Sequence, residues 1–370
     1  MHPISTLPLG LLLLCIPQAV LSAPANFNAG SDRKVESRTN TNAASMPFKH
    51  ACTSNLRAGA MAMMTTGGAK AQLTKPAIKP AFSEKVQGLH LEQDLAHHSW
   101  VYKEWPRAWI PEQCLYEARY NGYVGDEFEV RDIWYSDCKA SWTVCRHVDA
   151  GSESSSSESW ESITRTLGQV PVGMRQFVSN LVILPDSIGN KKGTAAADKA
   201  LAGAAAYTRG SVMAYSPSYF KLGVLIHEFT HILDKMALRD EVEKQGYPAG
   251  THFSETPAWE AAYRNDTAVP TPYSRVALPE DFADAGRWAI SSITHEGGLD
   301  AYSSGWRGCE AQIETYKRFL AHIIYPPSGS CTDKIDTSKP VPVPVRSPAD
   351  AGDKKAGSSL HDDVGGRAHA

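Results

Sequence analysis

The sequence lacks three features that would each point to a class of function. It has no marked excess of charge, since 37 Lys and Arg residues stand against 40 Asp and Glu residues, a formal net charge of −3. It has no Cys-x-x-Cys pair, which argues against a zinc cluster built from cysteine. Beyond the N-terminus it has no apolar run long enough to cross a bilayer. Nucleic acid and membranes are therefore not predicted as partners.

The N-terminus has the pattern of a secretory signal peptide. An apolar run spans about residues 9–21 and is followed by small residues, as at a signal-peptidase site. The run is too short to span a membrane, and Pro8 and Pro17 would interrupt a buried helix. We therefore expect residues 1–23 to be a signal peptide and the mature protein to be secreted and extracellular. The sequon Asn-Asp-Thr at Asn265 predicts a glycosylated surface position.

Composition divides the rest of the chain into three parts. Residues 24–88 are rich in Ala, Ser, Thr, Asn, Gly and Pro, which predicts a low-complexity segment compatible with a pro-region. Residues 89–332 hold all nine Trp residues, so we expect one domain with a sizeable core there. Residues 333–370 are rich in Pro, Ala, Asp and Lys and are expected to be a disordered tail. Nothing in the sequence predicts an oligomer, and a monomer is assumed.

The cysteine count agrees with secretion. Of seven cysteines, Cys15 lies in the predicted signal peptide, and the even number that remains predicts three disulfides in a secreted chain. Six cysteines can pair in many ways, so the sequence leaves the connectivity open. The preferred pairing is Cys138 with Cys145, Cys309 with Cys331 and, by elimination, Cys52 with Cys114.

Hydrophobic periodicity predicts both strands and helices. Alternation over residues 128–135 predicts a strand, the apolar run over 177–184 a buried strand, and 210–215 a further short strand. Helical spacing over 159–169 and 310–324 predicts two helices. The expected fold class is α+β with a small mixed sheet, stabilised by disulfides.

The strongest chemical signal is the stretch KLGVLIHEFTHILD at residues 221–234. Its apolar residues recur at spacings of three and four, which predicts a helix with one buried side. His227 and His231 stand four residues apart, so both imidazoles can reach one metal ion. Glu228 lies one step round the helix, where an unligated carboxylate can accept a proton from water. The pattern predicts a catalytic zinc site, although such a His pair can also be the polar edge of a core helix.

The strand expected at residues 210–215 leads directly into this helix. In zinc peptidases an edge strand just before the zinc helix binds the extended substrate backbone as an added strand. Residues 210–215 are therefore a candidate for substrate binding, and an interior strand is the alternative.

A third ligand has to come from the residues after His231. The metzincin pattern requires Gly and His at positions 234 and 237, where this chain has Asp and Ala, so that class is excluded. The aspzincin pattern G-T-x-D-x-x-Y-G is also missing. The remaining class uses a glutamate on a second helix, with an acid four residues later that orients a ligating histidine.

Glu280 meets this requirement, because Asp284 follows it by four residues. Glu255 and Glu260 do not, because Trp and Arg occupy the corresponding positions. Proline and acidic residues around Glu280 are typical of the first turn of a helix. In the alternative reading, Glu280 and Asp281 only complement the helix dipole.

Three stretches together carry a resemblance to known families: HEFTHILD, then Tyr273-Ser274-Arg275, then EDFAD at residues 280–284. This pattern resembles that of lethal-factor-like gluzincins and of related fungal secreted metallopeptidase-like proteins named after conidiation. The resemblance extends over about residues 210–293. It implies a zincin-like catalytic domain within residues 89–332. The residue roles that it implies are His227, His231 and Glu280 as ligands of one Zn²⁺, Glu228 as general base, Tyr273 at the oxyanion, and Asp284 behind a ligating histidine.

The sequence thus predicts a secreted zinc metalloendopeptidase that hydrolyses peptide or protein substrates. A secreted, non-catalytic binding or cell-surface protein with the same fold is the alternative. Glu228 favours catalysis, because a binding protein has no use for a base beside the metal. A zinc hydrolase of a non-peptide bond would use the same ligands.

Overall fold

The computed structural model describes residues 79–82, 89–151, 159–185, 188–189, 192, 194–195, 201, 203–327, 329, 331 and 334–344. The predicted signal peptide, most of the 24–88 segment, Cys52 and the end of the predicted tail lie outside the described residues. None of the helices in these ranges combines the length and apolarity that crossing a bilayer requires.

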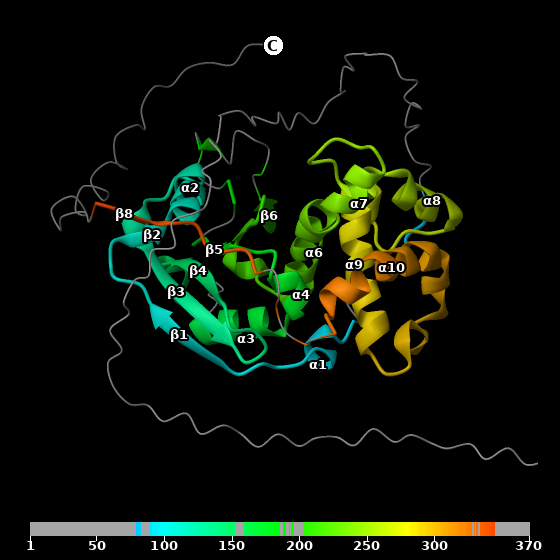
Figure 1. Cartoon of the computed structure of the whole chain (residues 1–370), viewed down its shortest axis with the longest axis horizontal. Coiled ribbons are helices and arrows are strands. Elements are labelled where there is room, and N and C mark those ends of the chain that lie inside the picture. Colours follow the sequence, from blue (N-terminus) through cyan, green and yellow to red (C-terminus); the bar gives the residue numbers. More distant parts are fainter. Residues whose placement is uncertain are drawn as a thin grey trace, which may run out of the picture. The chain divides into compact units, whose positions relative to one another are not determined.

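A mixed sheet of six strands lies on the left of Figure 1. Its order is β1-β3-β4-β5-β7-β6. β1, β3 and β4 pair antiparallel, β4, β5 and β7 run parallel, and β6 returns antiparallel to β7. The expected α+β class with a mixed sheet is confirmed. The strands are β1 (Trp100–Glu104), β3 (Phe128–Tyr135), β4 (Ser141–His147), β5 (Asn180–Ile183), β6 (Ala206–Arg209) and β7 (Val212–Tyr215).

The two faces of the sheet contribute to two separate cores. Along β3, Ile133 and Tyr135 enter the larger core, whereas Val130 enters the smaller core that α2 (Glu112–Tyr120) shares. The alternation over residues 128–135 reflects this two-sided packing. The central strand β5 is buried along its whole length, which explains its continuous apolar sequence.

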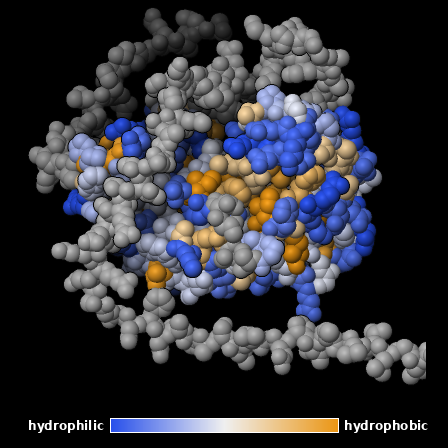
Figure 2. All heavy atoms as spheres, in the orientation of Figure 1, coloured by the Kyte–Doolittle hydropathy of each residue, from blue (hydrophilic) through white to orange (hydrophobic). Residues whose placement is uncertain are grey.

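Helices α6, α7, α8, α9 and α10 of the larger core lie on the right of Figure 1. α6 packs against α9, which also packs against α10. Gly286 of α9 permits the close approach of α6, because a Cβ at this position would lie 2.6 Å from Thr230 Oγ1. Hydrophilic residues gather over α7 in Figure 2. The helices are α1 (Leu91–Asp94), α3 (Trp160–Gln169), α4 (Val172–Arg175), α6 (Leu222–Ile232), α7 (Arg239–Lys244), α8 (Pro257–Asn265), α9 (Leu278–Thr294) and α10 (Glu310–Ile324).

The strand before the zinc-motif helix is interior. β7 is hydrogen-bonded on both sides, to β5 and to β6. Substrate pairing along residues 210–215 is therefore wrong, because no backbone edge is free there. The edge position on this side of the described sheet belongs to β6, which contacts α6.

The disulfides differ from the preferred pairing. Cys114 is bonded to Cys145, with Cα atoms 6.4 Å apart, and Cys138 is bonded to Cys331, with Cα atoms 5.4 Å apart. The β3–β4 hairpin separates Cys138, at its turn, from Cys145, which lies well along β4 and points at α2. Proximity in sequence was therefore a poor guide to pairing. Cys309 is buried and unbridged within the described residues, so its pairing with Cys331 is also wrong. The pairing of Cys114 with Cys52 is wrong as well, because Cys114 is bonded to Cys145.

Part of the predicted disordered tail is ordered. β8 (Pro340–Pro342) pairs antiparallel with β2 (Trp109–Pro111), and Val343 is buried in the smaller core. Prolines fit this two-stranded ribbon because alternate residues of an edge strand need no ladder hydrogen bond. The domain thus extends beyond residue 332, at least through residue 344.

Mass spectrometry of a non-reduced digest should recover the Cys114–Cys145 and Cys138–Cys331 peptide pairs. Cys331→Ser should lower the free energy of unfolding by about 2–4 kcal/mol, because this bridge closes a long loop in the unfolded chain. Under reducing conditions the variant and the wild type should unfold alike. A peptide pair that links Cys138 to Cys145 would contradict the structure.

Candidate metal centre

α6 presents both histidines of the motif on one side. Its apolar residues are buried in the larger core, which fixes the rotation of the helix. His227 and His231 lie one turn apart, with ring centroids separated by 4.8 Å. Glu228 is buried beside them. The helix therefore presents two imidazoles and one carboxylate toward the same region.

α9 brings Glu280 to this pair from a distant part of the sequence. Its Oε2 atom lies 3.1 Å from His227 Nε2 and 3.3 Å from His231 Nε2. One donor atom from each of the three residues lies within 4.8 Å of the others. The structure thus brings together the three side chains that the sequence predicted as ligands.

The donor spacing fits a tetrahedral zinc ion. Zinc bonds of about 2.0–2.1 Å to nitrogen and oxygen place neighbouring ligand atoms about 3.3 Å apart in a tetrahedron. The distances from Glu280 Oε2 to the two Nε2 atoms, 3.1 and 3.3 Å, are close to this value. Two imidazoles and one carboxylate also leave a fourth position open, as in catalytic zinc sites. The donor types and the two distances to Glu280 therefore suit zinc, and the two imidazole donors lie within 4.8 Å of each other.

Asp284 orients the His227 ring by binding Nδ1, the ring nitrogen that does not face Glu280. Its Oδ1 atom accepts a hydrogen bond from His227 Nδ1 at 2.9 Å and another from Arg287. Its Oδ2 atom accepts from Ser274 Oγ at 2.9 Å and from Thr271 Oγ1. Burial alone would raise the pKa of Asp284, but hydrogen bonding to His227 and the charge of Arg287 hold it below its usual value. The ionised carboxylate fixes the ring with Nε2 directed at Glu280.

The charges around His227 favour a cation. Burial lowers its pKa, but hydrogen bonds to Asp284 and Glu280 outweigh this effect and raise the pKa to about 9. The pKa of Glu280 lies well below its usual value, because the two histidines outweigh the effect of burial. A proton on His227 balances these carboxylates, and a metal ion would displace it.

Glu228 and Tyr273 border the same centre. Burial raises the pKa of Glu228, although the neighbouring histidines oppose this shift. Tyr273 lies in a 3₁₀ turn just before α9 and is half exposed, with its ring 5.9 Å from that of His227. Burial and the nearby carboxylate of Glu280 raise the pKa of Tyr273 to about 12, so the phenol keeps its proton at neutral pH.

Three contributors to the site were not found from the sequence. Thr271 and Ser274 supply hydroxyls to Asp284, and Arg287 supplies a charge from one turn further along α9. The sequence does show hydroxyl residues close to Tyr273, but only the folded loop directs these hydroxyls at Asp284. Arg287 stands three residues after Asp284, a spacing that places both on one face of α9.

Asp234, the last residue of the zinc-motif stretch, is shielded from solvent. A π-helical turn (Leu233–Ala237) continues α6 and keeps Asp234 buried. Its carboxylate accepts hydrogen bonds from Ser254 N at 2.8 Å, Ser254 Oγ at 2.7 Å and His252 Nδ1 at 3.1 Å. Asp234 therefore anchors the segment that precedes α8, and none of these hydrogen bonds comes from a metal-site histidine. Asn265, at the end of α8, is exposed.

Fold and site define an α+β protein with a mixed sheet, two disulfides and a gathered His-His-Glu group. The chain belongs to the family of conidiation-specific protein Con-13, which matches residues 84–289. It is similar to Conidiation-specific protein 13 of Neurospora crassa, with 24% identity over 222 residues, 56% of this chain. The chain spans about half of that relative, 55% of its length. No solved structure matches the chain.

The family assignment corrects the expectation of a gluzincin peptidase. The matching family is Con-13 and not a peptidase family, and neither its name nor that of the relative states an activity. Short motifs such as H-E-x-x-H describe how a metal can be held, and unrelated proteins can share them. Inferences about chemistry therefore rest on the geometry of this site.

The purified protein should bind one zinc ion per chain, measured by elemental analysis. His231→Ala should abolish stoichiometric binding, and Asp284→Asn should weaken it by about 10–100-fold, because the ring of His227 loses its support. His295→Ala is the matched control, since this ring pairs with Asp94 at 2.9 Å, away from the centre. Full zinc content in His231→Ala would rule out the assigned ligands.

Zinc affinity should depend on pH through His227. Zinc needs the neutral ring, whereas the metal-free site holds a proton with a pKa of about 9. Affinity should therefore rise with pH and level off above pH 9, and fall by about tenfold per pH unit below it. Competition with a chromogenic chelator, corrected for the chelator's own titration, measures this slope. A flat profile between pH 6 and 9 would contradict it.

Proposed function

We propose that this protein is a secreted, zinc-dependent hydrolase that cleaves peptide bonds, and that the sheet, α6 and α9 form a zincin-like catalytic fold. The observation that carries the proposal is the spacing of the donor atoms of His227, His231 and Glu280, with buried Glu228 beside them. The two disulfides agree with an extracellular location.

The side chains around the centre supply the parts of a hydrolytic mechanism. Zinc, when bound, contributes Lewis-acid activation of a water and of the scissile carbonyl. Glu228, with its raised pKa, accepts the proton of the attacking water and returns it to the leaving amine. Tyr273 donates its phenol proton in a hydrogen bond to the developing oxyanion. Asp284 keeps Nδ1 of His227 protonated and its Nε2 available as a ligand.

The outer edge of β6, with which no described strand pairs, supports a peptide as the substrate. Among the described strands β6 pairs only with β7, and it contacts α6. An extended peptide can pair with such an edge through backbone hydrogen bonds, which recognise any sequence. The edge next to the metal-site helix thus offers the role that residues 210–215 cannot fill.

Glu228→Gln should separate metal binding from chemistry. The variant should keep one zinc per chain but lose hydrolysis by about 10²–10⁴-fold, because an amide cannot accept the proton of water. The assay follows cleavage of a mixed peptide library by mass spectrometry, with and without a chelator. Glu314→Gln, which removes only an exposed ion pair with Lys317, is the matched control.

Two results would contradict the proposal. Undiminished cleavage by Glu228→Gln would remove Glu228 from the mechanism. Absence of chelator-sensitive cleavage by the zinc-loaded wild type would favour a secreted binding protein that keeps the metal centre without catalysis.

A further inference from the structure

A short segment just before the predicted domain lies against the loop that borders the metal centre. Residues 79–82, here called the N-terminal clasp, lie against the loop at residues 269–275, which carries Tyr273. We infer that the clasp is a positioning element of the site: it holds this loop in the conformation that supports Asp284 and places Tyr273. The inference deepens the proposed function, although its main test does not depend on activity.

Backbone hydrogen bonds attach the clasp to the first residue of the loop. Phe82 N donates to Val269 O at 3.0 Å, and Val269 N donates to Pro80 O at 2.9 Å. Ala81 and Val269 form a parallel bridge between these two bonds. The start of the loop therefore gains the pairing of a short strand, which it lacks without the clasp.

The other end of the loop is attached to the clasp by a side chain. Arg275 Nε donates to Lys79 O at 2.8 Å. The clasp thus contacts residues at both ends of one loop. Bridging the two ends restricts the conformations of the residues between them.

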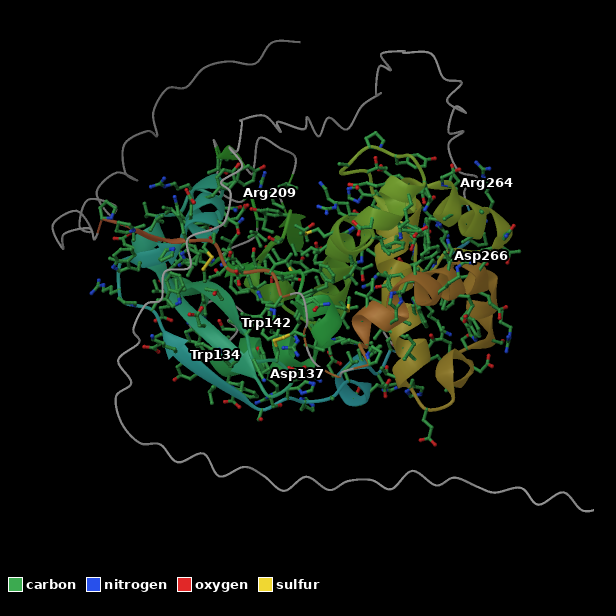
Figure 3. All side chains as sticks on the ribbon, in the orientation of Figure 1. Trp134, Asp137, Trp142, Arg209, Arg264 and Asp266 are labelled. Carbon is green, nitrogen blue, oxygen red and sulfur yellow. A yellow bond between two sulfur atoms is a disulfide. The ribbon has the colours of Figure 1, made fainter. Side chains whose placement is uncertain are left out.

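Lys79 anchors the clasp at the end of α8, where Figure 3 labels Arg264 and Asp266. Its ammonium donates to the carbonyl oxygens of Tyr263 and Asp266 and lies 4.6 Å from the centre of the Tyr263 ring. The last carbonyls of a helix have no partner within the helix and carry partial negative charge, so an ammonium group stabilises them.

Phe82 anchors the clasp to α9. Its ring meets Trp288 edge to face, with centroids 4.5 Å apart. Trp288 stands one turn after Asp284 on the same helix. The clasp therefore connects the loop with the helix that carries both Glu280 and Asp284.

Between its two anchored ends, the loop supports Asp284. Thr271 and Ser274 donate to Asp284 Oδ2. Inside the loop, Thr271 N donates to Ser274 Oγ at 3.2 Å, and Tyr273 N donates to Thr271 Oγ1 at 3.2 Å. The Thr271 hydroxyl that donates to Asp284 thus also accepts from the backbone of Tyr273, and the Ser274 hydroxyl holds the backbone of Thr271. Loss of the end anchors should free both groups together.

The clasp lies inside residues 24–88, the low-complexity segment whose composition is compatible with a pro-region. Removal of all residues before the predicted domain would remove the clasp as well. If the segment is cleaved, the inference therefore requires the cleavage site to lie before residue 79.

Hydrogen exchange in the full-length chain tests the clasp directly. Phe82→Ala and Lys79→Met should each speed amide exchange in residues 267–277 by about tenfold. The first variant loses the ring contact with Trp288, and the second loses the hydrogen bonds to the helix carbonyls. Lys79→Arg should stay close to the wild type, because a guanidinium can also donate to the helix carbonyls. Tyr102→Ala, a half-exposed aromatic on β1, is the control and should leave this segment unchanged. Unchanged exchange in both clasp variants overturns the inference.

A kinetic measurement tests whether the clasp acts through Tyr273. In an active enzyme, Phe82→Ala should lower kcat by about fivefold with little change in KM. In the double variant with Tyr273→Phe, kcat should be little lower than in Tyr273→Phe alone. An equal loss of kcat in both backgrounds overturns positioning through Tyr273. If the wild type shows no hydrolysis, the proposed function fails, and the exchange measurement alone decides the role of the clasp.

Discussion

The carboxylate of Asp284 is shielded from water and receives hydrogen bonds from His227 on α6, from Arg287 on α9 and from two hydroxyls of the loop before α9. A buried charge is stable only when such partners compensate it, and removing one partner leaves a costly unpaired group. Because the donors come from three segments, the carboxylate is satisfied only after these segments have packed together. The orientation of His227 is therefore coupled to the packing of the helices.

The same constraint sets the electrostatics of the centre. Glu228, Glu280 and Asp284 lie around two imidazoles in a mostly buried region, so the site needs positive charge. In the metal-free protein a proton on His227 meets this need, which is why the pKa of this ring is raised to about 9. A divalent cation held by the three donors would meet it more fully. The proposed chemistry follows from this balance of charge and geometry.

Family and chemistry are separate conclusions for this chain. The Con-13 match covers the segment that contains the whole metal centre, yet it names no activity. The motif-based assignment to gluzincin peptidases was wrong as a statement of family. The ligands that the motif suggested nevertheless lie together in the structure. A short pattern constrains how side chains can meet a metal, whereas ancestry depends on the whole sequence.

Local patterns determined the parts of this protein that depend on nearby residues. The spacing of three and four established α6 and the shared side of His227 and His231, and the acid pair four residues apart in α9 singled out Glu280 and Asp284. Only the tertiary structure decided which cysteines bond, which strand is at the edge of the sheet, and that chain segments before and after the predicted domain pack onto it. These features join residues far apart in sequence, and no local period or spacing records a contact that forms only when the chain folds back on itself.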